Sequence, residues 1–235
     1  MKIIKNILKF LFVLAAVLAV ISAVVYFVYN EPLPVGKEGK EAEALAQKML
    51  KAINYTNYTK TRFIEWSVNN KHFYKWDKEK HRADVKWDEN LVKLNLKNYS
   101  KSEVFIDGVK MHTEPREELI EKAVNYFNND SFWLVAPFKI MDKGTVRKLV
   151  KLDNGEEALL VTYTQGGNTP GDSYLWKLKS NGFPESYKMW AQIIPIGGME
   201  ASWDDWKVTE TTTYLPSKHK FLFFTLDMGD VKGYN

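Results

Sequence analysis

Cysteine is absent from this chain of 235 residues. Its absence excludes disulfide bonds, thiol catalysis and zinc sites built on cysteine. It also excludes the attachment of a lipid through an N-terminal cysteine. The absence is compatible with export, because many exported bacterial domains have no disulfide bonds.

Sequence motifs for catalysis and for cofactors are also lacking. None of the four histidines has a second ligand at metal-binding spacing, and the chain has no HExxH motif, nucleophile elbow or P-loop. The glycine-rich segment 166–171 lacks the lysine, the hydroxyl residue and the following helix of a phosphate cradle, so it is expected to form a loop. These absences predict a non-catalytic protein without a cofactor or a metal.

A strong excess of charge is lacking as well, although the formal net charge is +4. The first thirty residues contain three lysines and no acid, which leaves 30 basic and 29 acidic residues in the remainder. Nucleic-acid binding requires a basic stripe or patch. Binding to nucleic acid is therefore not expected.

The longest apolar run covers residues 10–28 and contains one polar residue, Ser22. As a helix it would extend roughly 28 Å, which is close to the thickness of a bilayer core. Lysines precede the run and Tyr26, Phe27 and Tyr29 lie at its far end, as expected for a cytoplasmic N-terminus and an interfacial aromatic belt. We therefore expect residues 1–30 to form a single-pass anchor in the cytoplasmic (inner) membrane, with the following domain on the exported, periplasmic side.

A cleaved signal peptide is the alternative for this segment. Such a peptide has a shorter apolar region and ends in small residues before the cleavage site. The best candidate site, Ile21-Ser22-Ala23, has a bulky residue where a small one is required, and apolar residues continue beyond it. The length of the run favours an uncleaved anchor.

Residues 31–40 are rich in proline, glycine and charge, which is typical of a linker with few contacts to the domain that follows. Residues 41–53 then repeat apolar side chains at helical spacing and predict an amphipathic helix that packs on the core. A second helix is expected from Pro115 to Phe127, ending at the polar residues 128–130.

Elsewhere apolar and polar residues alternate, most clearly at residues 92–97. Such alternation is typical of antiparallel strands with one buried face. Turn sequences at 107–108, 153–155 and 181–182 predict hairpins, and longer strands are expected at 202–214 and 218–226 around Pro216. The predicted fold of residues 41–235 is mainly β: one antiparallel sheet of roughly ten strands, curled into an incomplete barrel and covered by a few helices.

Five tryptophans fall in the predicted strands and are the candidate ligand-binding residues. They are Trp66, Trp76, Trp87, Trp176 and Trp190. If the sheet curls, their shared face becomes a concave apolar lining, which suits an apolar ligand. Packing in a filled core explains the same residues equally well.

Three stretches resemble the LolA-like superfamily of periplasmic lipoprotein- and lipid-binding domains. They are residues 132–138 (FWLVAPF), residues 174–184 (YLWKLKSNGFP) and residues 206–219 (WKVTETTTYLPSKH). The resemblance covers roughly residues 40 to 228. It implies an incomplete barrel around an apolar cavity that holds acyl chains, and it transfers no contact residue. The helical anchor and the missing lipid-attachment cysteine depart from the family pattern and argue against a soluble shuttle.

The sequence therefore predicts a membrane-anchored, exported, non-catalytic domain that binds an apolar ligand such as a lipid or an acyl chain. The alternative is a structural domain of the cell envelope with a filled core, or one that binds an envelope protein. A continuous apolar cavity of several hundred cubic ångströms would favour the first hypothesis.

Overall fold

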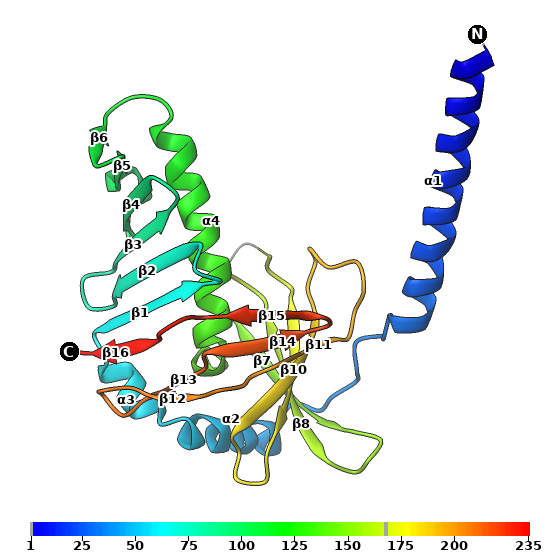
Figure 1. The fold of residues 1–235 in the computed structure, drawn as a ribbon. Helices are drawn as coiled ribbons and strands as arrows, with labels where there is room; N and C mark the ends of the chain where they lie inside the picture. Colours follow the sequence, from blue (N-terminus) through cyan, green and yellow to red (C-terminus); the bar gives the residue numbers. More distant parts are fainter. Residues whose placement is uncertain (1, 167–168) are drawn as a thin grey trace.

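The computed structural model describes residues 2–166 and 169–235, so part of the glycine-rich segment, residues 167 and 168, lies outside the described chain. Helix α1 (Lys2–Tyr29) extends away from the domain (Figure 1). Its residues 4–29 are long and apolar enough to cross a membrane, and none of that span is buried against the domain. The predicted N-terminal helix is confirmed.

Most of the described domain consists of two seven-stranded antiparallel sheets, with one further pair of strands. In spatial order the first sheet contains β16 (Lys232–Tyr234), β1 (Phe63–Val68), β2 (His72–Asp77), β3 (Arg82–Trp87), β4 (Asn90–Asn95), β5 (Glu103–Ile106) and β6 (Val109–Met111). The second contains β15 (Phe224–Asp227), β14 (Lys218–Phe221), β11 (Met199–Ser202), β10 (Pro184–Trp190), β9 (Ser173–Leu178), β8 (Glu157–Tyr163) and β7 (Thr145–Lys151). The predicted antiparallel β class is confirmed.

The C-terminal segment connects the two sheets. Strand β15 pairs with β14 in the second sheet and β16 pairs with β1 in the first. Between these pairings, Ser67 donates a backbone hydrogen bond to Met228 (3.0 Å) and Asn69 donates one to Asp227 (2.8 Å). The prediction of one continuous sheet was wrong, because the strands form two sheets and the consecutive strands β15 and β16 belong to different ones. Among the described strands β6 and β7 remain edges, so the arrangement does not close.

The predicted hairpins are confirmed. Asp107 and Gly108 both have positive φ (49° and 77°), as a two-residue turn between antiparallel strands requires. The segments 202–214 and 218–226, in contrast, are not single strands. The first is interrupted at Asp205 (φ 50°) and separates into β11, β12 (Lys207–Val208) and β13 (Tyr214–Leu215), and the second turns at Leu222.

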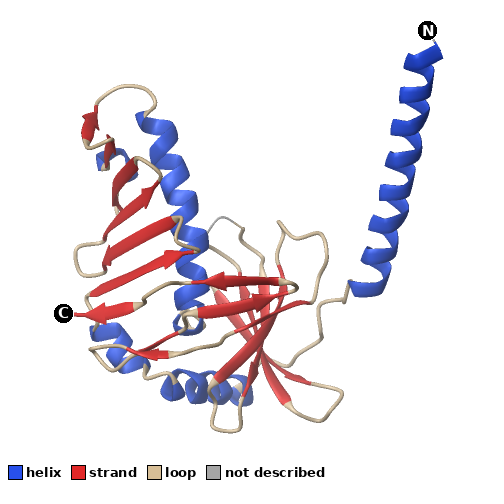
Figure 2. Cartoon of the chain, viewed as in Figure 1, coloured by secondary structure: helices blue, strands red, loops and turns tan. Residues whose placement is uncertain are grey.

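Helix α2 (Lys40–Ala52) confirms the first predicted helix of the domain, and the short α3 (Tyr55–Lys60) follows it. Helix α4 (Arg116–Val135) runs beside the first sheet and packs on β3, β4 and β5 (Figure 2). The 3₁₀ turns cover Tyr99–Lys101 and Ala136–Phe138. The predicted end of α4 at residues 128–130 was wrong, because Asp130 is buried and bonded to the first sheet and does not cap the helix.

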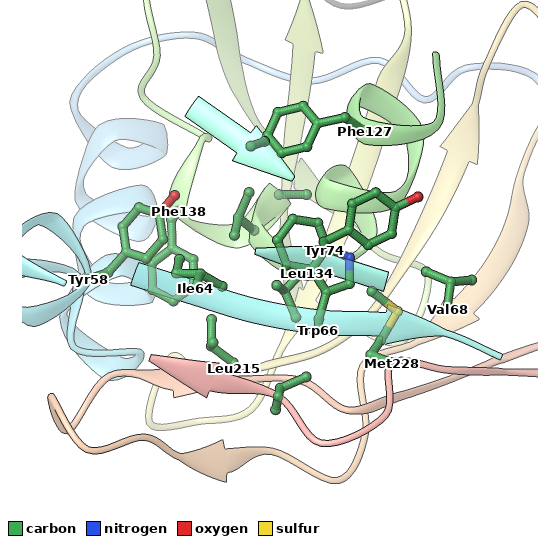
Figure 3. Close-up of a cluster of buried hydrophobic side chains, with 14 of the residues drawn as sticks. Tyr58, Ile64, Trp66, Val68, Tyr74, Phe127, Leu134, Phe138, Leu215 and Met228 are labelled. Atoms are coloured by element: carbon green, nitrogen blue, oxygen red, sulfur yellow. The ribbon is translucent and has the colours of Figure 1, made fainter. Parts of the chain in front are cut away.

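One hydrophobic core joins both sheets and α4. Figure 3 shows Trp66 of β1 beside Tyr74 of β2, and their rings are stacked at 4.5 Å. The ring of Phe127 of α4 lies 6.1 Å from that of Trp66. Tyr58 stacks on Phe138 at 4.0 Å at another part of the same cluster. The alternating residues of the strands and the apolar stripe of α4 therefore bury against each other.

Residues 31–40 are extended, but the prediction that they make few contacts was wrong. Glu31 accepts a hydrogen bond at its carbonyl from Trp190 Nε1 (2.8 Å), and its carboxylate pairs with Lys188 (2.6 Å). Lys37 exchanges two backbone hydrogen bonds with Leu149 at the edge strand β7 (2.9 and 2.8 Å). Gly36 lies so close to β7 that a Cβ atom there would meet the Lys148 side chain at 2.7 Å. The segment is thus docked onto the second sheet.

Candidate functional site

Four of the five predicted tryptophans lie in or against the shared core, and the fifth lies in a different cluster. Trp66 and Trp87 are 3% exposed on the face of the first sheet that packs against α4, and the partly buried Trp76 meets the edge of the Phe127 ring on the same face. Trp176 is fully buried in the second sheet. Trp190 packs in a separate cluster on the opposite face of that sheet. The structure therefore does not bring the five together, and it buries three of them in the core.

A cavity of about 550 Å³ lies beside this core, between the C-terminal half of α4 and one edge of the second sheet. We call it the sheet-edge cavity. Helix α4 contributes Asn128, Asn129, Phe132 and Trp133, and the strands contribute Tyr163, Tyr174, Tyr187 and Met189. None of the five predicted tryptophans is among the residues that line it.

The spacing of the lining residues explains how these elements form one wall. Residues 128, 129, 132 and 133 lie on one face of α4, because positions four apart are one turn from each other. Tyr174 and Trp176 are two residues apart in β9, so they lie on the same face of the sheet. The alternation that marks Trp176 in the sequence therefore marks Tyr174 as well.

Aromatic side chains form much of the cavity wall. Phe132 lies 4.9 Å from Tyr174 and 5.5 Å from Tyr163, measured between ring centroids. Trp133 lies 5.7 Å from Tyr187. Tyr187 and Met189 are only 1% and 2% exposed, so they form the inner end of the wall. Such a wall offers a large apolar surface to a ligand.

The three tyrosines remain neutral phenols at physiological pH. Burial raises the pKa of Tyr163 and of Tyr187 well above the ordinary tyrosine value, and the neighbouring tyrosines raise both further. Burial also raises the pKa of Tyr174, followed by the effect of the Asp172 carboxylate. The hydroxyl of Tyr163 is shielded from water and has no hydrogen-bond partner among the described residues.

Charged groups gather at the outer part of the cavity. The partly exposed Lys139 pairs with Asp142 (2.7 Å), and Asp142 and Lys143 are exposed. Asp172 is buried, and its carboxylate accepts hydrogen bonds from the Gln192 backbone N–H (2.9 Å) and from the Thr169 hydroxyl. The cavity thus has an aromatic interior and two lysines at its rim.

The strand ends around the cavity all lie on the same side of the second sheet, so the edge that gives the sheet-edge cavity its name is formed by strand termini and not by an edge strand. Thr145 at the start of β7 pairs with Tyr163 at the end of β8, and Ser173 at the start of β9 pairs with Trp190 at the end of β10. The loops that follow β8 and β10 complete the lining with Gln165, Gly166, Thr169, Ala191, Ile193 and Ile194. Because Gly197 of the loop 191–198 is hydrogen-bonded to Asn30 and Glu31, the cavity lies on the side of the domain where α1 ends.

A second hollow of about 520 Å³ lies at the turns of the β3–β4 and β5–β6 hairpins. Its lining includes Lys86, Asp88, Glu89, Lys93 and Asp107, with Leu91 and Phe105 as its apolar members. This lining is mostly charged, and few apolar groups are available to hold a ligand. The sheet-edge cavity is therefore the better candidate site.

Comparison of this chain with protein-family models, with curated proteins and with solved structures finds no match.

Proposed function

We propose that this chain is a membrane-anchored binding domain whose sheet-edge cavity takes a lipid or an acyl chain. The observation that carries the proposal is the volume of about 550 Å³ together with the aromatic and aliphatic wall. Small-molecule sites typically have volumes of about 300–1,000 Å³ and mostly apolar linings. Each buried methylene contributes about 0.8 kcal/mol, so an acyl chain has sufficient driving force to enter.

The charges at the rim indicate which kind of head group the cavity would accept. Lys139 and Lys143 lie among the lining residues at the exposed part of the site. A carboxylate or phosphate there would face the ammonium group of Lys143 and would share that of Lys139 with Asp142, while its chain lies against Phe132 and Met189. We therefore propose an anionic amphiphile as the ligand, whereas the sequence, which identified no polar anchor for a head group, predicted selectivity by length and bulk rather than by charge.

The proposal is one of binding without catalysis, on the exported side of an inner membrane. Among the described residues that line the cavity there is no histidine, serine or cysteine, and the buried Asp172 carboxylate is occupied by hydrogen bonds from Thr169 and Gln192. Lysines 2, 5 and 9 precede the apolar part of α1, which favours a cytoplasmic N-terminus. A LolA-like domain would have the same function, but the proposed ligand binding is supported by the cavity and not by that resemblance.

Photocrosslinking of a fatty acid tests the proposal. The full chain in lipid nanodiscs is irradiated with palmitic acid that carries a diazirine near its terminal methyl group, and the modified peptides are identified by mass spectrometry. We expect adducts around Phe132 and around Met189, and their loss on addition of unlabelled palmitate. Adducts in α1 alone would contradict the proposal, since a membrane probe labels that helix in any case.

A matched pair of variants assigns the adducts to the cavity. Ala191→Phe adds a ring to a residue that lines the cavity and should abolish the adducts around Met189. Ala52→Phe adds the same ring to the partly exposed end of α2 and should leave them unchanged. Equal labelling of the two variants would contradict binding in this cavity.

A further inference from the structure

The hairpin between β14 and β15 ends in three exposed apolar residues. Leu222, Phe223 and Phe224, which we call the apolar tip, are 61%, 85% and 58% exposed. Phe221 pairs with Phe224, so Leu222 and Phe223 are the two turn residues. Turn positions of this kind normally hold glycine, asparagine or aspartate.

Neither stability nor solubility explains these residues. Leu222 has a φ of 53°, a conformation that glycine adopts freely and a branched apolar side chain adopts at a cost. Three neighbouring exposed apolar side chains also lower solubility in water. The apolar tip is therefore best explained by contact with an apolar partner.

The strand register places the apolar tip beside the end of the membrane anchor. Ala201 of β11 pairs with Phe221, and β11 begins directly after Gly198. At about 3.4 Å per residue along a strand and about 4.8 Å between strands, the tip lies within roughly 10 Å of Gly198. The preceding residue, Gly197, is hydrogen-bonded to Glu31 (2.9 Å) and to the side chain of Asn30 (2.8 Å).

A second exposed apolar residue lies at the same edge. Ile193, in the loop that follows β10, is 72% exposed and is also part of the lining of the sheet-edge cavity. In Figure 1 this loop and the β14–β15 turn both lie on the side of the domain where α1 ends. Because none of the apolar span of α1 is buried, the domain does not fix the tilt of this helix, and we use Asn30 and Glu31 to locate the membrane surface.

From this arrangement we infer that the apolar tip and Ile193 insert into the surface of the bilayer that holds α1, so that the sheet-edge cavity opens towards lipid. The inference rests on the proposed membrane anchoring, and it identifies membrane lipid as the source of the ligand. Phenylalanine and leucine are suited to this position, since their apolar side chains enter the boundary between head groups and acyl chains.

Depth-dependent quenching tests the inference. The chain has no cysteine, so single cysteines can be introduced and labelled without background. The full chain is placed in phosphatidylglycerol–phosphatidylethanolamine vesicles that contain a spin-labelled lipid as the quencher. A fluorophore at Phe223→Cys or Ile193→Cys should be quenched by the lipid and shielded from aqueous iodide.

Two further sites provide the controls. Val109→Cys lies in β6, at the far edge of the first sheet, and its residue is 65% exposed, so its fluorophore should be quenched by iodide alone. Ala16→Cys lies within α1 and reports anchoring itself. If the fluorophore at residue 16 is quenched by lipid while that at residue 223 is open to iodide, the inference is overturned and the anchor remains. Shielding from both quenchers at residue 223 also overturns it, since a protein partner then covers the tip.

Charged variants separate docking of the tip from ligand binding. Phe223→Asp should remove lipid quenching at a labelled Ile193→Cys, whereas Val109→Asp should leave it unchanged. If quenching at residue 193 persists in Phe223→Asp, the apolar tip does not hold this edge at the membrane. Absence of palmitate adducts in the cavity, with quenching intact, would overturn the proposed ligand and leave the docking surface in place.

Discussion

Acid should destabilise the domain through His219, which is fully buried in β14. Its ring lies 4.5 Å from Trp203 and 5.3 Å from Trp133, measured between centroids. Nδ1 lies 2.9 Å from the carbonyl oxygen of Ser202, so Nδ1 carries the proton in the neutral ring. Burial lowers the pKa of His219 from 6.5 to about 4, against the opposing effects of the Ser202 and Trp133 backbone and of Asp204.

The sign and the size of the effect follow from this shift. In the unfolded chain His219 binds a proton below pH 6.5, whereas in the folded chain it binds one only below about pH 4. The free energy of unfolding should therefore fall as the pH decreases through this window, and His219 should have no further effect below it. The difference corresponds to about 3 kcal/mol, at 1.36 kcal/mol per pKa unit.

Urea denaturation of the full chain in nanodiscs measures the effect, because all eight tryptophans lie outside α1 and report unfolding of the domain. His219→Asn offers a side-chain N–H near the position of Nδ1 and cannot be protonated in this range. The stability difference between wild type and His219→Asn should shift by about 3 kcal/mol in favour of the variant between pH 7 and pH 4. His81→Asn, at an exposed turn, should follow the wild-type profile. A difference that is independent of pH would refute the reasoning.

The same denaturation assay at pH 7 tests three further residues. Trp176→Ala should cost about 3–5 kcal/mol, because a fully buried indole is removed from the core; a loss below 1 kcal/mol would contradict this. Asp130→Ala should cost about 1–3 kcal/mol, because the Tyr74 hydroxyl loses its buried partner and His72 loses a hydrogen-bond partner at 2.9 Å; an unchanged midpoint would argue against that network. Leu222→Gly should stabilise the domain by about 1 kcal/mol through relief of the positive φ, and destabilisation would show that the leucine side chain contributes to the fold.

Local signals in the sequence determined much of the secondary structure. The apolar run at residues 10–28 predicted α1, since length and hydropathy alone define such a helix. Alternation predicted β1 to β4, and Asp107-Gly108 predicted the β5–β6 hairpin. These features depend on neighbouring residues, so they are visible without the fold.

Contacts between distant segments decided the features that the sequence reasoning missed. Helix α4 continues past Asn128 because His72 and Tyr74, more than fifty residues away, bond to Asp130. The extended segment after α1 is held by Lys188 and Gly197, although its composition is that of a free linker. No local pattern reports such partners.

The candidate site also depends on contacts between distant segments of the chain. The tryptophans marked apolar strand faces correctly, but alternation shows only which residues share a face and not whether a neighbouring element fills the space above it. The first sheet is packed by α4 and its tryptophans are core residues. At the edge of the second sheet the end of α4 leaves a cavity beside Tyr163 and Tyr174. The residue pattern is enough to show which strand faces are apolar. Which of these faces borders a cavity depends on the tertiary fold, because a cavity forms where two packed elements leave a space between them.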